Sequence, residues 1–314
     1  MYAYILAQAV EASNVVAVCR SNYDVASRDG FTINSSIFGS NLTVRPHVVR
    51  TVGEAVVNDR RPFDYVVICA KSIPSQPSLP EQIAPAVGPS TTIVLIQNGI
   101  GIEQIYRDAF PTNPILSCVV YLPATQTQPA VVSHREVELL HIGTYPSDAP
   151  SSHQTSADHF ASLIRHGGAT ARVHDDVQQE RWRKLLVNAT WNPICALSRS
   201  RDAQFLASSS IALSYVQNVM LEITSIAQAC GYQSISSSVV DHQIGRAKAR
   251  SLPGIEPSML ADALAGRNME VDAIVGNAVR IAEDKGVHTP LLRSIYALLK
   301  ALDAHFTMGR EGQP

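Results

Sequence analysis

The sequence of 314 residues predicts an α/β domain over residues 1–174, followed by an all-helical domain over residues 175–314. Up to about residue 174, short apolar runs rich in Val and Ile alternate with stretches of helical periodicity. This pattern is typical of parallel strands that are covered by helices on both faces. From residue 175 onward the strand signals stop, and helical periodicity continues between breaks at Gly, Pro and Ser residues.

The first ten residues have the pattern of an amphipathic helix, and an apolar strand at residues 15–19 follows, with Arg20 directly after it. In an α/β nucleotide-binding protein, this helix and strand form the second part of the opening strand–helix–strand unit. The first strand and its glycine-rich loop would stand before Met1, so we expect a domain whose first strand is missing. The strands at residues 15–19 and 64–69 would then pair with each other or receive another segment between them. We also expect the first helix to have an exposed or displaced start.

The rest of the first domain shows further strand and helix signals in order. A hairpin is expected from residues 30–34 and 42–49, with a helix near residues 52–57 after it. Buried strands are expected at residues 64–72 and 91–101, each followed by a helix. The segment at residues 115–146 is rich in β signals and would add antiparallel strands, before a helix at residues 157–166 and a strand at 169–174.

The composition argues against several classes of function. Hydrophobic residues make up 46% of the chain, charged residues 17%, and the formal charge is -2, so no nucleic-acid partner is expected. No apolar run approaches the ~20 residues that span a bilayer, so no membrane partner is expected. HExxH, HxH and CxxC groupings are absent, so no metal site is expected. The five cysteines are widely spaced, which favours reduced thiols and a cytoplasmic location.

Three polar side chains recur on one face of the helix predicted at residues 181–197. Lys184, Asn188 and Asn192 are spaced at i, i+4 and i+8, and apolar residues surround them. A solvated polar stripe would explain this pattern on a surface helix. On a helix that is apolar on every side, such groups must be hydrogen-bonded or line a cavity, which indicates a site. Farther along, Ser258 has the position of a helix cap and Glu270 that of a first-turn carboxylate, and neither indicates a site by itself.

Several motifs occur in an order and at a spacing that together resemble the ketopantoate reductase (2-dehydropantoate 2-reductase) family, from residue 1 to about residue 305. They are RSNYD at residues 20–24, CAK at 69–71, QNGIG at 97–101, WRKLLVNATWNP at 182–193, and SMLAD at 258–262 with ME at 269–270. The resemblance implies a Rossmann-like N-terminal domain of the dinucleotide-binding type, a helical C-terminal domain, and an active site in the cleft between them. The apolar C-terminal helices could in addition support a homodimer.

The resemblance also implies roles for individual residues. Lys184 resembles the family's catalytic lysine, which donates a proton to the substrate carbonyl oxygen, and Glu270 resembles the glutamate that binds and orients the hydroxy acid. Arg20 stands where the family's basic residue meets the 2′-phosphate of NADP, and Lys71 lies on the cofactor side. The residues expected to hold the substrate or the nicotinamide end are Asn98, Asn188, Asn192 and Ser258.

The lack of a glycine-rich loop ahead of the first helix leaves more than one function open. The expected function is NADPH-dependent reduction of a 2-oxo acid to a 2-hydroxy acid, and the sequence does not specify which small molecule is the substrate. Under one explanation, NADP binds without that loop, through Arg20, Lys71 and Asn98. Under another, the sequence is cut short ahead of Met1, and the reductase lacks its start. The alternative is a cofactor-independent isomerisation, elimination or cyclisation on the same scaffold. A non-catalytic binding protein is a further alternative.

Overall fold

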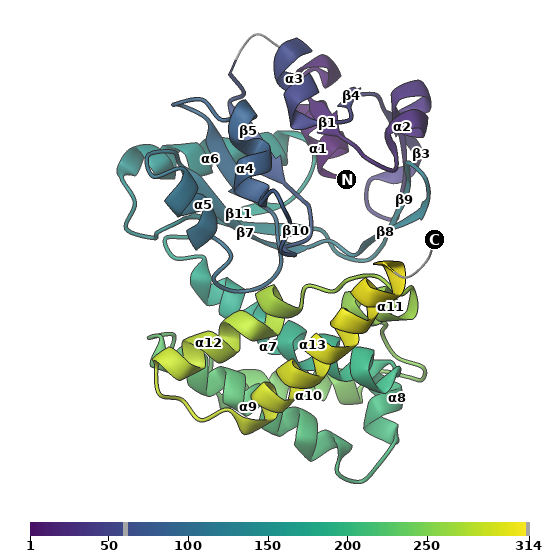
Figure 1. Ribbon diagram of the computed structural model, residues 1–314, viewed down its shortest axis with the longest axis vertical. Coiled ribbons are helices and arrows are strands. Elements are labelled where there is room, and N and C mark those ends of the chain that lie inside the picture. Colours follow the sequence, from purple (N-terminus) through teal and green to yellow (C-terminus); the bar gives the residue numbers. More distant parts are fainter. Residues whose placement is uncertain (59–61, 312–314) are drawn as a thin grey trace. The chain divides into compact units, whose positions relative to one another are not determined.

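The computed structural model describes residues 1–58 and 62–311, which form two compact units (Figure 1). The first unit, here called the N-terminal unit, comprises Met1–Ala70, Ser75–Gln97 and Glu103–Val177. The second, here called the helical unit, comprises Lys71–Pro74, Asn98–Ile102 and Gln178–Pro314. Two short segments from the first half of the sequence therefore belong to the helical unit.

A five-stranded sheet in the order β11-β10-β7-β6-β5 organises the N-terminal unit. β5, β6 and β7 are parallel, β10 is antiparallel to β7, and β11 is parallel to β10. All four residues of the central strand β6 are buried, as the continuous apolar run predicts. The strands are β5 (Tyr65–Ile68), β6 (Thr92–Leu95), β7 (Ile115–Tyr121), β10 (Leu139–Thr144) and β11 (Ala171–Val173).

Helices cover both faces of this sheet because its apolar side chains alternate between the faces. On one face, Val94 and Leu116 join a cluster with residues of α1 (Tyr2–Ala9) and α6 (Ser151–His166). On the other face, Ile93 and Leu95 join a cluster with residues of α4 (Leu79–Ile83) and α5 (Gln104–Ala109). The α/β class expected for this part of the chain is confirmed.

A second sheet has four strands in the order β3-β2-β9-β8. β2 and β3 form the expected antiparallel hairpin, and β9 runs parallel to β2. These strands are β2 (Phe31–Ser35), β3 (Gly39–Val44), β8 (Ala124–Gln128) and β9 (Val131–His134). The remaining helical segments of this unit are η1 (Ala12–Asn14), α2 (Tyr23–Asp29), α3 (Val52–Asn58) and η2 (Ala84–Ala86).

The expectation that the strands after residues 14 and 63 pair with each other, or share an inserted strand, is wrong for the described residues. β1 (Val16–Val18) pairs in parallel with β4 (His47–Val49) as a separate two-stranded sheet, whereas β5 pairs with β6. Hydrogen bonds from Cys19 N to Val49 O and from His47 N to Val15 O, at 2.8 and 2.9 Å, extend the β1–β4 pair. β4 therefore satisfies backbone groups of β1 that would otherwise need another partner.

The start of α1 is buried, contrary to the exposed or displaced start that we expected. Tyr2 and Ile5 lie in the same apolar cluster as Phe160 of α6, and burial lowers the pKa of the Met1 amino group. The packing is so close that a Cβ on Gly167 would lie 2.1 Å from the carbonyl oxygen of Ile5. The hydrophobic gain from these two side chains holds the helix start against α6.

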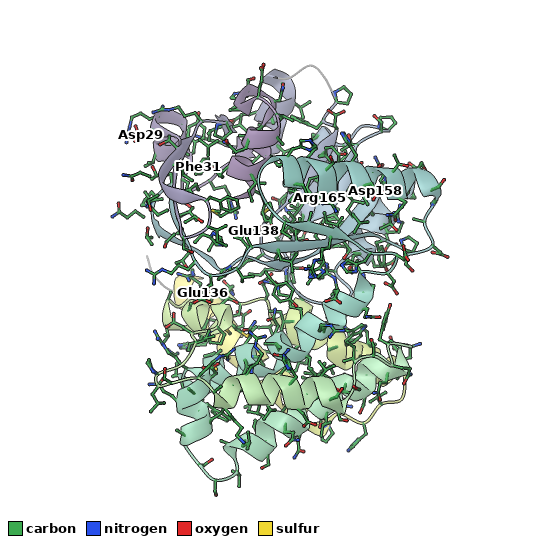
Figure 2. The ribbon with its side chains drawn as sticks, turned by 180° about the vertical axis from the view of Figure 1, so that it is seen from behind. Asp29, Phe31, Glu136, Glu138, Asp158 and Arg165 are labelled. Atoms are coloured by element: carbon green, nitrogen blue, oxygen red, sulfur yellow. The ribbon has the colours of Figure 1, made fainter. Side chains whose placement is uncertain are left out.

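Surface side chains also tie helices to strands in the N-terminal unit (Figure 2). Arg165 of α6 donates from its Nε and Nη2 atoms to the carbonyl oxygen of Ala171 in β11, at 3.1 and 2.9 Å. Glu138, next to the start of β10, accepts a hydrogen bond from the backbone N–H of Thr170. These contacts fix the edge strand β11 against both neighbouring elements.

The helical unit is built around the long helix α7, and the described part of residues 175–314 contains no strand, as predicted. α7 packs against α9, α11 and α13 through one continuous apolar cluster that includes Leu186, Met220 and Leu299. Among the described helices, none is both long and apolar enough to cross a bilayer. The helices are α7 (Gln178–Ser198), α8 (Asp202–Ala207), α9 (Ala212–Ala229), α10 (Ser237–Lys248), α11 (Ser258–Leu264), the π-helical η3 (Asp272–Gly276), α12 (Asn277–Asp284) and α13 (Pro290–Glu311).

Candidate active site

Helix α7 carries three of the predicted site residues inside the helical unit. Trp182, Leu185 and Leu186 are buried in the apolar cluster, which fixes the rotation of the helix about its axis. That rotation places Lys184 and Asn188 at partly buried positions and leaves Asn192 buried, with 5% of its surface exposed. The polar stripe predicted from the sequence is therefore not a solvated surface.

The loop at residues 98–102 follows β6 and brings Asn98 into the helical unit. Gly99 adopts a φ of +104°, and a Cβ at this position would lie 2.3 Å from the carbonyl oxygen of Ala273 in η3. Only glycine fits such a backbone without strain. The N–H of Ile100 donates to the same carbonyl oxygen at 3.0 Å, and Asn277 Nδ2 donates to the carbonyl oxygen of Ile100 at 2.6 Å. The loop is thus held directly against η3 and α12.

The amide of Asn98 connects Lys184 to Glu270. Lys184 Nζ donates to Asn98 Oδ1 at 2.8 Å, and Asn98 Nδ2 donates to Glu270 Oε2 at 3.4 Å. The other carboxylate oxygen of Glu270 accepts from the backbone N–H of Ser72 at 3.0 Å. A cation, an amide and a carboxylate therefore form a continuous hydrogen-bonded chain.

Burial changes the protonation of both ionisable groups in this chain. It lowers the pKa of Lys184 from 10.5 to about 7, an effect that the charge of Arg181 reinforces and that of Glu270 opposes. Burial also raises the pKa of Glu270, which is 8% exposed, while hydrogen bonds from Ser72 and Asn98 act in the opposite direction. An amine that is half protonated near neutral pH is suited to general acid catalysis.

The other predicted residues have separate positions. Lys71 Nζ forms an ion pair of 2.5 Å with Asp262 Oδ2, and Asp262 also accepts from Arg267 Nε at 3.0 Å. Ser258 is the exposed first residue of α11, where Pro257 is the N-cap, so its side chain does not supply the predicted helix cap. Arg20 is exposed in the N-terminal unit, directly beyond β1. Among the predicted residues, hydrogen bonds thus join Lys184 to Asn98 and Asn98 to Glu270.

Three contributors to this arrangement were not selected from the sequence. Arg181 precedes Lys184 by one helical turn, and its Nη1 atom donates to the carbonyl oxygen of Gly99 at 2.9 Å. Asp262 holds Lys71, and Ser72 acts through its backbone N–H. Arg181 could have been selected from its i, i+3 spacing to Lys184 on an apolar helix. Ser72 could not, because a residue that acts through its backbone N–H leaves no signal in the sequence.

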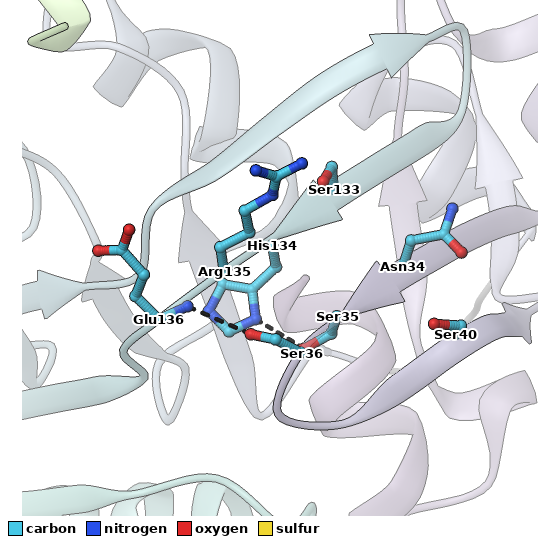
Figure 3. A pocket seen from close by; sticks show the side chains of 8 residues that line it. All are labelled: Asn34, Ser35, Ser36, Ser40, Ser133, His134, Arg135 and Glu136. Atoms are coloured by element: carbon cyan, nitrogen blue, oxygen red, sulfur yellow. Dashed lines mark hydrogen bonds between the residues drawn. The ribbon is translucent and has the colours of Figure 1, made fainter. Parts of the chain in front are cut away.

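A polar pocket lies elsewhere, on the four-stranded sheet of the N-terminal unit (Figure 3). Ser35 Oγ and His134 Nδ1 are 2.8 Å apart, and His134 Nε2 lies 3.0 Å from the carbonyl oxygen of Val137. The N–H of Glu136 donates to Ser36 Oγ at 3.2 Å. These side chains bond the sheet to its own turns, so we assign the pocket a structural role. Its lining residues are Asn34, Ser35, Ser36, Ser40, Ser133, His134, Arg135 and Glu136.

Comparison with known proteins agrees with the family resemblance over nearly the whole chain. The family described as "Ketopantoate reductase PanE/ApbA" matches residues 1–147, and "Ketopantoate reductase PanE/ApbA C terminal" matches residues 176–303. The crystal structure of 2-dehydropantoate 2-reductase from Methylococcus capsulatus is similar with a TM-score of 0.82 and 30% identity, covering 97% of this chain and 94% of that one.

Two curated relatives extend the comparison. The 2-dehydropantoate 2-reductase of Nostoc sp. is 23% identical over 95% of this chain and 90% of that enzyme. The meiotically up-regulated gene 72 protein of Schizosaccharomyces pombe is 27% identical over 97% of this chain but only 55% of that protein. The chain thus spans about half the length of this last relative.

Proposed function

Because this chain belongs to the ketopantoate reductase family, we propose that it reduces a 2-oxo acid to a 2-hydroxy acid with NADPH. The observation that carries the proposal is the hydrogen bond of 2.8 Å between Lys184 and Asn98, on a lysine whose pKa is lowered to about 7. Such an amine can deliver a proton near neutral pH. In the proposal, residues 1–174 form the dinucleotide-binding domain and residues 175–314 the C-terminal domain.

The position of Arg20 fits the 2′-phosphate of a phosphorylated nicotinamide cofactor. Arg20 is exposed directly beyond β1, and no described carboxylate pairs with its guanidinium. A basic residue at this strand end suits the 2′-phosphate of NADP, whereas NAD binders usually carry an acidic residue there. Lys71 is already paired with Asp262, so we assign the phosphate to Arg20 and the nicotinamide end to Asn98. When bound, NADPH supplies the hydride that reduces the 2-oxo carbon.

Lys184 acts as the general acid of the proposed reaction. As the carbonyl carbon is reduced, negative charge develops on the carbonyl oxygen, and the Lys184 ammonium donates a proton to it, giving the hydroxyl group of the product. Asn98 Oδ1 holds the Nζ atom in place before this transfer. A positioned acid of this kind typically contributes a factor of about 10² to 10⁴ in rate.

Glu270 orients the substrate in the proposal and acts on the lysine by charge. Its carboxylate is fixed at both oxygens, by Asn98 Nδ2 and by the backbone N–H of Ser72. A buried carboxylate held in this way can accept a hydrogen bond from the hydroxyl group of a 2-hydroxy acid. Asn188, Asn192 and Ser258 keep their predicted roles in substrate binding as part of the proposal, and the homodimer and the cytoplasmic location stay predictions.

The decisive experiment measures NADPH oxidation by the purified protein with a panel of 2-oxo acids, ketopantoate first. Turnover should require the nucleotide and should fall about 10²- to 10⁴-fold in Lys184→Ala, with the variant still folded. Lys248→Ala, a change at an exposed lysine of the same unit, serves as the control. Product formation from a substrate in the absence of any nucleotide would replace the proposal with the cofactor-independent alternative.

A further inference from the structure

Arg181 is a buried cation one helical turn before Lys184, and the proposed mechanism gives it no task. Its surface is 3% exposed, although an arginine is seldom found so deeply buried without a specific partner. Its Nη1 atom donates to the carbonyl oxygen of Gly99 at 2.9 Å, across 82 positions of the sequence. The contact therefore joins α7 to the loop that carries Asn98.

The hydrogen bond from Arg181 acts on the peptide unit that joins Gly99 to Ile100, one residue beyond Asn98. Two other contacts of this short loop are described: the Ile100 N–H of the same peptide unit donates to Ala273 O, and Asn277 Nδ2 donates to Ile100 O. Arg181 is thus the side chain that restrains the loop closest to Asn98. Because the Asn98 amide must reach Lys184 and Glu270 together, a small movement of this peptide would lengthen both hydrogen bonds.

The charge of Arg181 adds a second effect on the same lysine. Several described charges act on the chain of Lys184, Asn98 and Glu270. Arg181 and Glu270 act on Lys184 with opposite signs, and Lys71 and Asp262 act on Glu270 with opposite signs. Loss of the arginine charge would favour the protonated form of Lys184.

We propose that Arg181 is a positioning residue of the reaction: it fixes the peptide between Gly99 and Ile100, one residue beyond Asn98, so that the Asn98 amide meets Lys184 and Glu270 in one arrangement. This inference rests on the proposed function and extends it to a residue that does not touch the substrate. The arginine acts through two separate properties, its donor geometry and its charge, and two substitutions separate them.

Arg181→Lys keeps the charge and loses the reach and geometry of the guanidinium, whereas Arg181→Gln keeps an N–H donor and loses the charge. We expect kcat to fall about ten- to a hundredfold in Arg181→Lys, with little change in KM and an unmoved alkaline limb of the pH profile. In Arg181→Gln, that limb should move to higher pH, because the pKa of Lys184 rises when the neighbouring positive charge is removed. Arg183→Gln removes the same charge from a partly exposed neighbour on α7 and should leave both readouts unchanged.

If both Arg181 variants fold and have the kcat and the alkaline pH limb of the wild type, the inference is overturned, and Arg181 has a structural role only. A second readout needs no turnover: the pH dependence of acylation at Lys184, followed by peptide mass spectrometry. Its midpoint should rise in Arg181→Gln relative to the wild type and to Arg183→Gln, and an unchanged midpoint would contradict the charge effect. An inactive wild-type protein would refute the proposed function alone, because the acylation measurement still tests Arg181. If Arg181→Gln does not fold, Arg181→Lys and the wild type decide the geometric part.

Discussion

Replacing Lys184 by Met should abolish activity and, at neutral pH, make the protein more stable. The substitution keeps an unbranched side chain of similar length and removes the ammonium. Lowering the pKa from 10.5 to about 7 corresponds to roughly 5 kcal/mol of unfavourable free energy for the charged form in the folded state. Against this gain, the Oδ1 atom of Asn98 loses its donor, which costs about 1 to 3 kcal/mol. We expect a net increase of about 2 to 4 kcal/mol in the free energy of unfolding at pH 7.

The pH dependence of this gain has a defined sign. Between pH of about 7 and 10.5 the unfolded chain holds a proton on Lys184 that the folded protein has released, so the stability of the wild type rises with pH in this window. Below the window both states are protonated, and the full penalty of burial is present. The advantage of Lys184→Met should therefore be largest at and below pH 7 and should shrink as the pH rises toward 10.5.

Urea unfolding of both proteins, followed by circular dichroism at several pH values, measures this difference directly. Lys248→Met removes an exposed lysine of the same unit and should change stability by less than about 0.5 kcal/mol at every pH. A Lys184→Met variant that is less stable than the wild type at pH 7 would refute the reasoning. The lysine would then be a structural residue that the fold stabilises in its charged form.

Three further predictions concern Glu270, Gly99 and Arg20. Glu270→Gln should lower kcat and shift the alkaline limb of the pH profile to lower pH, because Lys184 loses an attractive charge; an unmoved limb would show that the carboxylate does not act on the lysine. Gly99→Ala should lower the free energy of unfolding in urea by more than about 3 kcal/mol, because backbone strain and the clash with Ala273 add together. Gly231→Ala is the control: its φ is +99° but its surroundings are open, so it should cost only about 1 to 2 kcal/mol. Arg20→Ala should erase the preference for NADPH over NADH in calorimetric titrations, and equal affinities in the wild type would argue against its assignment to the phosphate.

The order of the elements was predictable because it depends on local patterns. The apolar run at residues 91–101 predicts a buried strand, which the structure has at Thr92–Leu95. The periodicity after residue 175 predicts helices, which the structure also has. The partner of a strand is a long-range property, and β1 shows the limit. Its apolar residues indicate a strand but do not show that β4, rather than β5, supplies its hydrogen bonds.

The same distinction applies to the candidate site. Lys184 and Asn188 were detectable because their spacing puts polar groups on a helix that is apolar elsewhere. Asn98 and Glu270 were named through the family motifs. The hydrogen bonds of Asn98 to Lys184 and to Glu270 depend on a loop conformation that only glycine at position 99 permits. Arg181 was missed because an arginine near the start of a helix is usually solvated, and its burial depends on a carbonyl 82 positions away.

The uncharged side chain of Asn98, between Lys184 and Glu270, affects the pH at which the lysine gains and loses its proton. A lysine and a glutamate in direct contact would each stabilise the charged form of the other, and the lysine would lose its proton only at strongly alkaline pH. The Asn98 amide transmits polarity through one donor and one acceptor, but it does not titrate. The Lys184 amine therefore gains and loses its proton close to neutral pH. In the proposed reaction, water would restore the proton that each turnover consumes.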